Sequence, residues 1–320
     1  MATFEYLDHY AKPLMQYLTD ETIIDIAVNP NGKIWVERVG YGSMQIVEGE
    51  FRNEDLQRLA KQIAGSKDKT IGKDVLMLSE MLEVDGRPVR VQAVLPPACV
   101  GIGALSIRKF PKSQIGSQNI DLLHGRMKPR KDVVKDVLET YANSQTLDAI
   151  AHLIIDNMLT VIVSGGTGSG KTTILKALLN HLPHDERIIT IEDVPEIILE
   201  QENVVPLMSD RKEINRNPKD LLAAVMRMRP DRFLIGELRG DETRTFIEAV
   251  NTGHPGSFTT VHANSAELAI NRLVLLGMGA ASNISEQLMR NEIESTIDLI
   301  IHAERIGSER GITEIFSPIL

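Results

Sequence analysis

A chain of 320 residues has room for two domains, because a single hydrophobic core usually stops growing at about 250–300 residues. Hydrophobic residues make up 42% of the chain and charged residues 25%, which excludes a disordered or fibrous protein. The formal net charge of −9 argues against a nucleic-acid coat protein, since binding to phosphates needs clustered positive charge.

Membrane spans and secretory signals are not expected. No apolar run reaches the length of about 18 residues that a membrane-spanning helix needs. The N-terminus lacks a basic segment followed by an apolar core. The single cysteine, Cys99, cannot form an internal disulfide. Together these features predict a cytoplasmic protein.

Residues 1–110 are predicted to form a smaller α+β domain. Two strand-like segments, Ile23–Val28 and Lys33–Arg38, are joined by the turn sequence Asn29-Pro30-Asn31-Gly32, which predicts a β-hairpin. The pattern over residues 81–109 alternates well enough for several further strands. A helix is expected between these regions, with one apolar face formed by Leu56, Leu59, Ile63 and Ala64.

The chain becomes polar over residues 111–146, which are predicted to be a linker. Residues 147–320 alternate between helical and strand-like segments, and this alternation predicts a mainly parallel sheet wrapped by helices. Strands are expected at 161–164, 187–191, 233–236, 257–261 and 297–302.

A phosphate-binding loop is predicted directly after the first of these strands. The segment from Gly165 to Thr172 matches G-x-x-x-x-G-K-[ST], with an apolar strand before it and a helix after it. Glycines let the backbone form a concave nest of N–H donors, Lys171 reaches the β- and γ-phosphates, and Thr172 can ligate Mg²⁺. The expected nucleotide-binding residues are Gly165, Gly166, Thr167, Gly168, Ser169, Gly170, Lys171, Thr172 and Thr173.

Carboxylates follow two later strands. Glu192 and Asp193 lie at the end of one apolar strand, where open α/β sheets bind ligands, and they are candidates to orient water or metal. Glu237 ends the next one and is a candidate to hold Mg²⁺ and to polarise the attacking water. The alternatives are a solvated acidic turn for the first pair and a purely structural pair with Arg239 for Glu237.

Two histidines, His254 and His262, lie on either side of the strand at 257–261. They are candidates to sense the γ-phosphate or to pass a signal to a neighbouring subunit, and the alternative is a structural hydrogen bond for each. A zinc site is not expected, because the chain has too few cysteines and no other ligand cluster accompanies them.

These motifs, in this order, resemble those of the traffic ATPases of type II and type IV secretion, most of all the VirB11/TrbB branch. Glu237 falls in what looks like the family's modified Walker B box, Glu192 in its Asp box and His262 in its His box. The looser resemblance of the N-terminal domain rests on Asn29-Pro30-Asn31-Gly32, Trp35-Val36-Glu37, Arg90-Val91-Gln92 and Ser106-Ile107-Arg108-Lys109.

The resemblance implies an α/β fold with a C-terminal RecA-like P-loop domain, a smaller α+β N-terminal domain and assembly into a hexameric ring. Members are cytoplasmic, so the expected place is the cytoplasmic side of the inner membrane, with inner-membrane secretion components and other secretion ATPases as partners. In the family, arginines of the N-terminal domain reach the nucleotide, which makes Arg90 and Arg108 candidates. Without the family, both would be exposed strand charges.

The function predicted from these residues is hydrolysis of MgATP between the two domains, with Glu237 and Glu192 positioning water and the linker acting as a hinge. Type II secretion or pilus motors, and a nucleotide-gated docking ring with incidental hydrolysis, remain alternatives. A RecA-like nucleic-acid translocase is a further one. It would use the basic residues Arg126, Lys128, Arg130, Lys131 and Lys135, which otherwise belong to a solvated linker.

Overall fold

The computed structural model describes residues 8–110, 128–279 and 284–320. The chain folds into two compact units. The first comprises Met1–Asp121, His184–Pro195 and Gln201–Asp231, and the second comprises Leu122–Pro183, Glu196–Glu200 and Arg232–Leu320. Two segments beyond the predicted linker therefore group with the N-terminal residues rather than with the P-loop.

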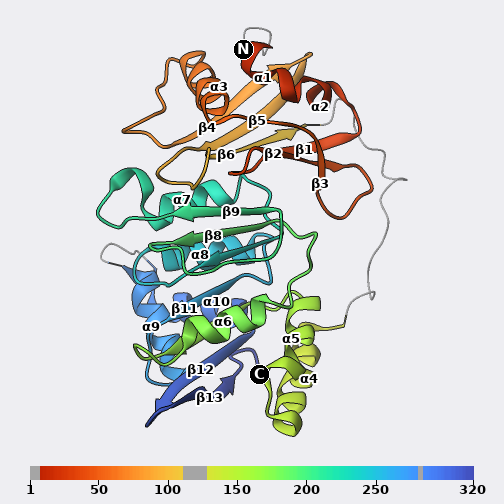
Figure 1. Ribbon diagram of the computed structural model, residues 1–320. Coiled ribbons are helices and arrows are strands. Elements are labelled where there is room, and N and C mark those ends of the chain that lie inside the picture. Colours follow the sequence, from red (N-terminus) through yellow and green to blue (C-terminus); the bar gives the residue numbers. More distant parts are fainter. Residues whose placement is uncertain (1–7, 111–127, 280–283) are drawn as a thin grey trace. The chain divides into compact units, whose positions relative to one another are not determined.

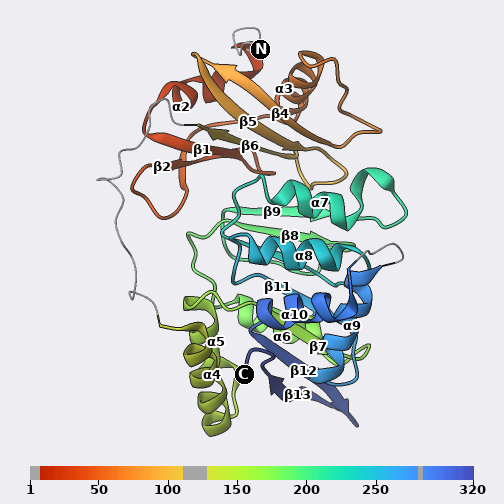
Figure 2. The ribbon, with the colours of Figure 1, turned by 180° about the vertical axis from the view of Figure 1, so that it is seen from behind.

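The first unit is built on a six-stranded antiparallel sheet in the order β3-β2-β1-β6-β5-β4. Helices α1, α2 and α3 lie on one face of it (Figures 1 and 2). The elements are α1 (Asp8–Ala11), η2 (Lys12–Leu14), α2 (Met15–Thr19), β1 (Ile23–Val28), β2 (Lys33–Arg38), β3 (Gln45–Glu50), α3 (Asn53–Gly65), β4 (Met77–Val84), β5 (Arg87–Val94) and β6 (Ala104–Lys109).

The predicted hairpin and helix are both confirmed. Strands β1 and β2 pair antiparallel with Ile26 opposite Val36, and Gly32 at φ +84° closes the turn between them. Helix α3 buries its predicted apolar face in the core beneath it. Burial of such side chains contributes about 1.5–3 kcal/mol each, so this core is the main stabilising force of the sheet.

A further strand pair belongs to the first unit although it follows the P-loop in sequence. Strands β8 (Ile188–Glu192) and β9 (Val204–Met208) pair in parallel, with η4 (Ile214–Arg216) and α7 (Pro218–Val225) after them. Strand β9 also joins the N-terminal segment, because Met208 N donates to Ala98 O at 2.9 Å and Val100 N to Pro206 O at 3.3 Å. These bonds explain why the pair groups with the N-terminal sheet.

The second unit carries the P-loop on strand β7. Strand β7 lies between β11 and β12 and is parallel to both, β10 is parallel to β11, and β13 is antiparallel to β12. Helix α6 covers one face of these strands and α8 and α10 cover the other (Figures 1 and 2). The elements are α4 (Arg130–Ser144), α5 (Leu147–Asp156), β7 (Val161–Gly165), α6 (Lys171–Leu179), β10 (Arg232–Ile235), α8 (Glu242–Asn251), β11 (Phe258–Val261), α9 (Ala266–Met278), α10 (Glu286–Thr296), β12 (Leu299–Ile306) and β13 (Glu309–Phe316).

The second half of the expected linker is a helix, which corrects the prediction for residues 130–144. Residues 111–127, including Arg126, lie outside the described residues. In α4, Val133, Val134 and Val137 are buried at helical spacing, and the helix packs against α5. Its low overall hydrophobicity hid this narrow apolar stripe, which is all that a helix on the surface needs.

The basic run in this region is held by carboxylates. Arg130 pairs with the buried Asp298, whose carboxylate also accepts a hydrogen bond from Thr160 N. Lys128 pairs with Asp136, and Lys135 lies 3.9 Å from Asp132. These contacts give carboxylate partners to three of the five cations that a nucleic-acid translocase would place on a strand, namely Lys128, Arg130 and Lys135. Within the described residues, no helix is both long and apolar enough to cross a membrane.

Candidate active site

The loop between β7 and α6 has a backbone that only glycine adopts easily. Gly165 has φ +153°, and an added Cβ there would lie 2.3 Å from the Ala303 carbonyl oxygen. Gly170 has φ +99° and is the N-cap residue of α6. All the expected nucleotide-binding residues lie in this loop and in the first turn of α6, where unpaired backbone N–H groups and the helix dipole favour an anion.

The loop fits a phosphate group in its polar atoms as well. Ser169 is 3% exposed, and its Oγ has no hydrogen-bond partner among the described residues. A buried polar atom without a partner is unfavourable unless a ligand satisfies it. A Cβ on Gly166 or Gly168 would meet nothing within 4 Å, so space is open on this side of the loop.

Lys171 folds back over the loop. Its Nζ donates to the carbonyl oxygens of Gly165 and Gly166, both at 3.0 Å, and lies 3.5 Å from each ring nitrogen of His262. Burial lowers the pKa of Lys171, while the carboxylate of Glu237 opposes that shift. The ammonium therefore has a charge partner close to the position that a bound phosphate would take.

Glu237 and His262 come together two residues beyond β10 and one beyond β11. His262 Nε2 lies 3.1 Å from Glu237 Oε1, and Arg239 Nη2 donates to Glu237 Oε2 at 2.7 Å. Buried Glu242 supports this turn, since its Oε1 accepts from Arg239 N at 2.7 Å and Gly240 N at 2.9 Å. The second unit thus assembles a cluster of Lys171, His262 and Glu237, with the expected Arg239 pair as part of it.

The donor set suits Mg²⁺, which prefers oxygen ligands. Thr172, half-buried in the first turn of α6, offers a hydroxyl, and Glu237 offers a carboxylate beside the P-loop lysine. His254 takes the structural alternative: its Nδ1 lies 3.3 Å from the Ala249 carbonyl oxygen, and its ring packs edge-on against Phe233.

Glu192 and Asp193 belong to the first unit. Glu192 ends β8, is 6% exposed, and its carbonyl accepts from Ser209 N at 2.9 Å. Asp193 Oδ1 accepts from Ser209 Oγ at 2.6 Å. The end of the strand is therefore ordered by hydrogen bonds, which differs from a freely solvated acidic turn.

Arg90 and Arg108 lie directly opposite each other on β5 and β6. Arg108 pairs with Asp25, with Nη2 at 3.1 Å from Oδ2, and Arg90 stacks over the Phe110 ring at 5.7 Å. Arg90 also lines a cavity of about 430 Å³, together with Lys67, Ser79, Glu80, Met81 and Arg227. The structure therefore puts both expected arginines in one row of the N-terminal sheet.

The buried carboxyl group of Asp25 makes the free energy of unfolding depend on pH. Burial raises the pKa of Asp25 to about 6, although Arg108 opposes the shift. A raised carboxyl pKa makes the folded state bind its proton more tightly, so the stabilisation is present at low pH and is lost as pH rises through about 6. We expect Asp25→Asn to gain stability relative to wild type between pH 4 and 7, measured by urea unfolding followed through Trp35 on β2.

Asp20→Asn is the control with the opposite sign. Hydrogen bonds from Arg38 and Thr22 lower the pKa of Asp20 to about 2, so wild type gains stability over that variant as pH rises above this value. A stability difference between wild type and Asp25→Asn that does not change with pH would contradict the assignment.

Two buried residues that support the predicted motifs were not singled out from the sequence. His302 on β12 has its Nδ1 2.8 Å from Ser164 Oγ, one residue before the P-loop. Arg187, just before β8, is fully buried. The only sequence signal for either was a polar residue at the edge of an apolar strand, which ordinarily indicates a solvent-exposed end.

The comparisons with known proteins agree with these motifs. The family model for "Type II/IV secretion system protein" matches residues 81–308. The conjugal transfer protein TrbB of Rhizobium radiobacter is 32% identical over 312 residues, covering 96% of this chain and 87% of that protein. The type IV secretion system protein PtlH of Bordetella pertussis is 33% identical, covering 97% of this chain and 94% of that protein.

A solved structure is similar over nearly the whole length. The crystal structure of the VirB11 ATPase from the Brucella suis type IV secretion system, in complex with sulphate, has a TM-score of 0.87 and 30% sequence identity. The alignment covers 97% of this chain and 94% of that one. This similarity supports the predicted fold, a P-loop ATPase domain preceded by a smaller α+β domain.

Proposed function

Because the chain belongs to the type II/IV secretion system protein family, we propose that it is the motor ATPase of a type IV secretion or conjugative transfer system, powering translocation of cargo or assembly of a pilus. Nucleotide binding and ATP hydrolysis follow from the family. The observation that carries the proposal is the cluster on the P-loop, in which His262 contacts both Lys171 and Glu237.

Phosphate binding, Mg²⁺ binding and activation of water are assigned to named groups of the site. The loop amides and Lys171 bind the phosphates, and Ser169 Oγ supplies a further hydrogen bond. Thr172 and Glu237 would hold Mg²⁺, which supplies positive charge to the β- and γ-phosphates. Glu237, with Glu192, orients water for attack on the γ-phosphorus, so that a new P–O bond forms and the bond to the β-phosphate oxygen breaks. The Glu237 carboxylate accepts the proton of the water, and ADP leaves.

Two arginines and a histidine are proposed to interact with the charge of the γ-phosphate. Arg90 and Arg108 are proposed to stabilise the charge that develops on the transferred phosphoryl group, since a guanidinium is planar and permanently charged. His262 contacts both Lys171 and Glu237, so it is suited to report whether the γ-phosphate is present.

The proposal also covers the oligomeric state, the cellular location and the partners of the protein. As the resemblance to the VirB11/TrbB branch implies, the proposal is a homo-hexamer on the cytoplasmic side of the inner membrane. It is peripherally attached, with membrane components of the apparatus and other secretion ATPases as partners. Direct nucleic-acid binding is not part of it, in keeping with the net charge of −9.

A dilution series tests the proposal. We expect ATPase activity per subunit to rise with the fraction of protein in a ring, because the proposal makes the assembled ring the working motor. Activity and mass, by steady-state assay and light scattering, are read on the same samples. Equal specific activity in monomer and ring would contradict the proposal that activity depends on ring assembly. Absence of turnover at every concentration would contradict the proposal that the protein is a motor ATPase.

A further inference from the structure

A fully buried arginine lies directly before β8. Arg187 is 0% exposed, and within the described residues its guanidinium donates to three neutral acceptors, while its Nη2 has no hydrogen-bond partner. Its Nε donates to Met228 O at 3.0 Å, and its Nη1 donates to Asn29 Oδ1 at 2.7 Å and to Asn203 Oδ1 at 2.6 Å. Asn29 lies in the turn between β1 and β2, so this one side chain ties the N-terminal hairpin to β8.

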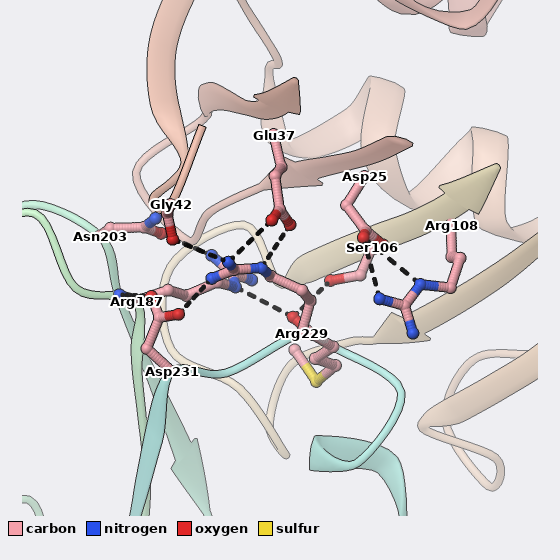
Figure 3. A network of polar contacts seen from close by, with 10 residues as sticks. Asp25, Glu37, Gly42, Ser106, Arg108, Arg187, Asn203, Arg229 and Asp231 are labelled. Carbon is pink, nitrogen blue, oxygen red and sulfur yellow. Dashed lines mark hydrogen bonds and ion pairs between the residues drawn. The ribbon is translucent and has the colours of Figure 1, made fainter. Parts of the chain in front are cut away.

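A second arginine ties the same two regions. Arg229 donates from Nε to Glu37 Oε2 at 2.6 Å and from Nη1 to Asp231 (Figure 3). Asp231 closes the link, because its Oδ2 accepts from the Arg187 backbone N at 2.7 Å and its own N donates to Arg187 O at 2.9 Å. Glu37 is on β2, so both contacts reach the same hairpin of the N-terminal sheet.

Strand β8 connects this network to Glu192, which is the last residue of the strand. All five of its residues are buried, and it pairs with β9 along its whole length. Because β8 is extended and paired with β9 at every residue, we expect a displacement at its first residue to be passed to its last. The far end is Glu192, one of the carboxylates proposed to orient water.

Stability alone does not explain a buried arginine. Burial lowers the pKa of Arg187 to about 10, with nearby Arg229 adding to the shift and Asp231 and Asp25 opposing it, so the charged form is less favoured there than in water. An apolar side chain of similar volume is often at least as stabilising in such a place. What the guanidinium adds is a planar fork whose three acceptors fix one orientation of β8 relative to the hairpin.

We infer that Arg187 is a positioning residue, through which the N-terminal β1–β2 hairpin sets the place of Glu192 for hydrolysis. This rests on the proposed ATPase function and deepens it. The N-terminal sheet then controls the catalytic carboxylate through β8, in addition to presenting its own arginines.

Arg187→Lys tests the inference, because lysine keeps the charge and loses the fork. We expect kcat to fall by about tenfold to a hundredfold, since misplacement of a reacting group by about 1 Å can cost about a hundredfold, with KM for ATP unchanged because the P-loop is intact. Asn29→Ala removes the Arg187 acceptor in the hairpin turn together with the bond from Asn29 Nδ2 to Asn203 Oδ1, and it leaves the Arg229–Glu37 pair in place. It should lower kcat in the same direction and less. Hydrogen exchange over residues 188–192 should rise in both variants.

A double-mutant cycle separates positioning from general damage. If Arg187 acts through Glu192, then Arg187→Lys costs nothing further in kcat in a Glu192→Gln background. The matched control is Arg130→Lys, which loses a comparable fork to buried Asp298 in the second unit and should keep wild-type kcat. Multiplying effects in the double variant, or full kcat in Arg187→Lys, would overturn this inference alone, whereas an inactive wild type would overturn the proposed function.

Discussion

Lys171→Ala loses ATP turnover, with kcat falling by at least about a hundredfold. The ammonium that rests on the Gly165 and Gly166 carbonyl oxygens is the one cation of the P-loop sequence, residues 165–173. Its loss removes the charge that the β- and γ-phosphates meet, so nucleotide affinity falls as well. Steady-state ATPase assays and titration with a fluorescent ATP analogue measure the two effects separately.

Lys176→Ala is the matched control for that result. Lys176 lies in the last turn of the same helix, α6, and takes no part in the loop contacts. We expect its variant to keep wild-type turnover and nucleotide affinity. Full activity in Lys171→Ala, with Lys176→Ala equally active, would mean that the P-loop does not hold the hydrolysed nucleotide.

Much of the fold could be predicted because its signals are local. The hairpin of β1 and β2 follows from the turn at 29–32, and the central strands β7, β10 and β11 follow from short apolar runs. Strands β9 and β13 were not predicted. Pro206 interrupts the pattern of β9, and β13 begins with charged residues that an edge strand can expose to solvent.

The candidate site also contains a part that local sequence predicts and a part that it does not. The spacing of the P-loop residues encodes their geometry, so the loop and its lysine were predictable from the sequence. The contacts of His262 with Lys171 and Glu237 join residues far apart in the chain and emerge only when β7, β10 and β11 lie side by side. Arg187 was missed because a lone arginine before an apolar strand has the same sequence signature whether it is buried in a network or exposed to solvent.

Glu237→Gln should separate hydrolysis from binding. Glutamine keeps the size of the side chain and an oxygen for Arg239 Nη2, but it removes the charge that accepts a proton and favours Mg²⁺. We expect kcat to fall by at least about a hundredfold while the variant still binds ATP and assembles as wild type does. Turnover, analogue binding and oligomer mass are measured on one preparation.

The control for Glu237→Gln is Glu248→Gln, the same chemical change on α8. Glu248 is exposed and pairs with Arg244 at 2.8 Å on its own helix, so its loss costs about 0.3–0.5 kcal/mol and leaves turnover unchanged. If Glu237→Gln turns over ATP as fast as Glu248→Gln, then Glu237 is a structural partner of Arg239 and the water must be activated elsewhere. Glu192 would be the remaining carboxylate to test, and the Arg187 network would then hold the principal catalytic group rather than a second one.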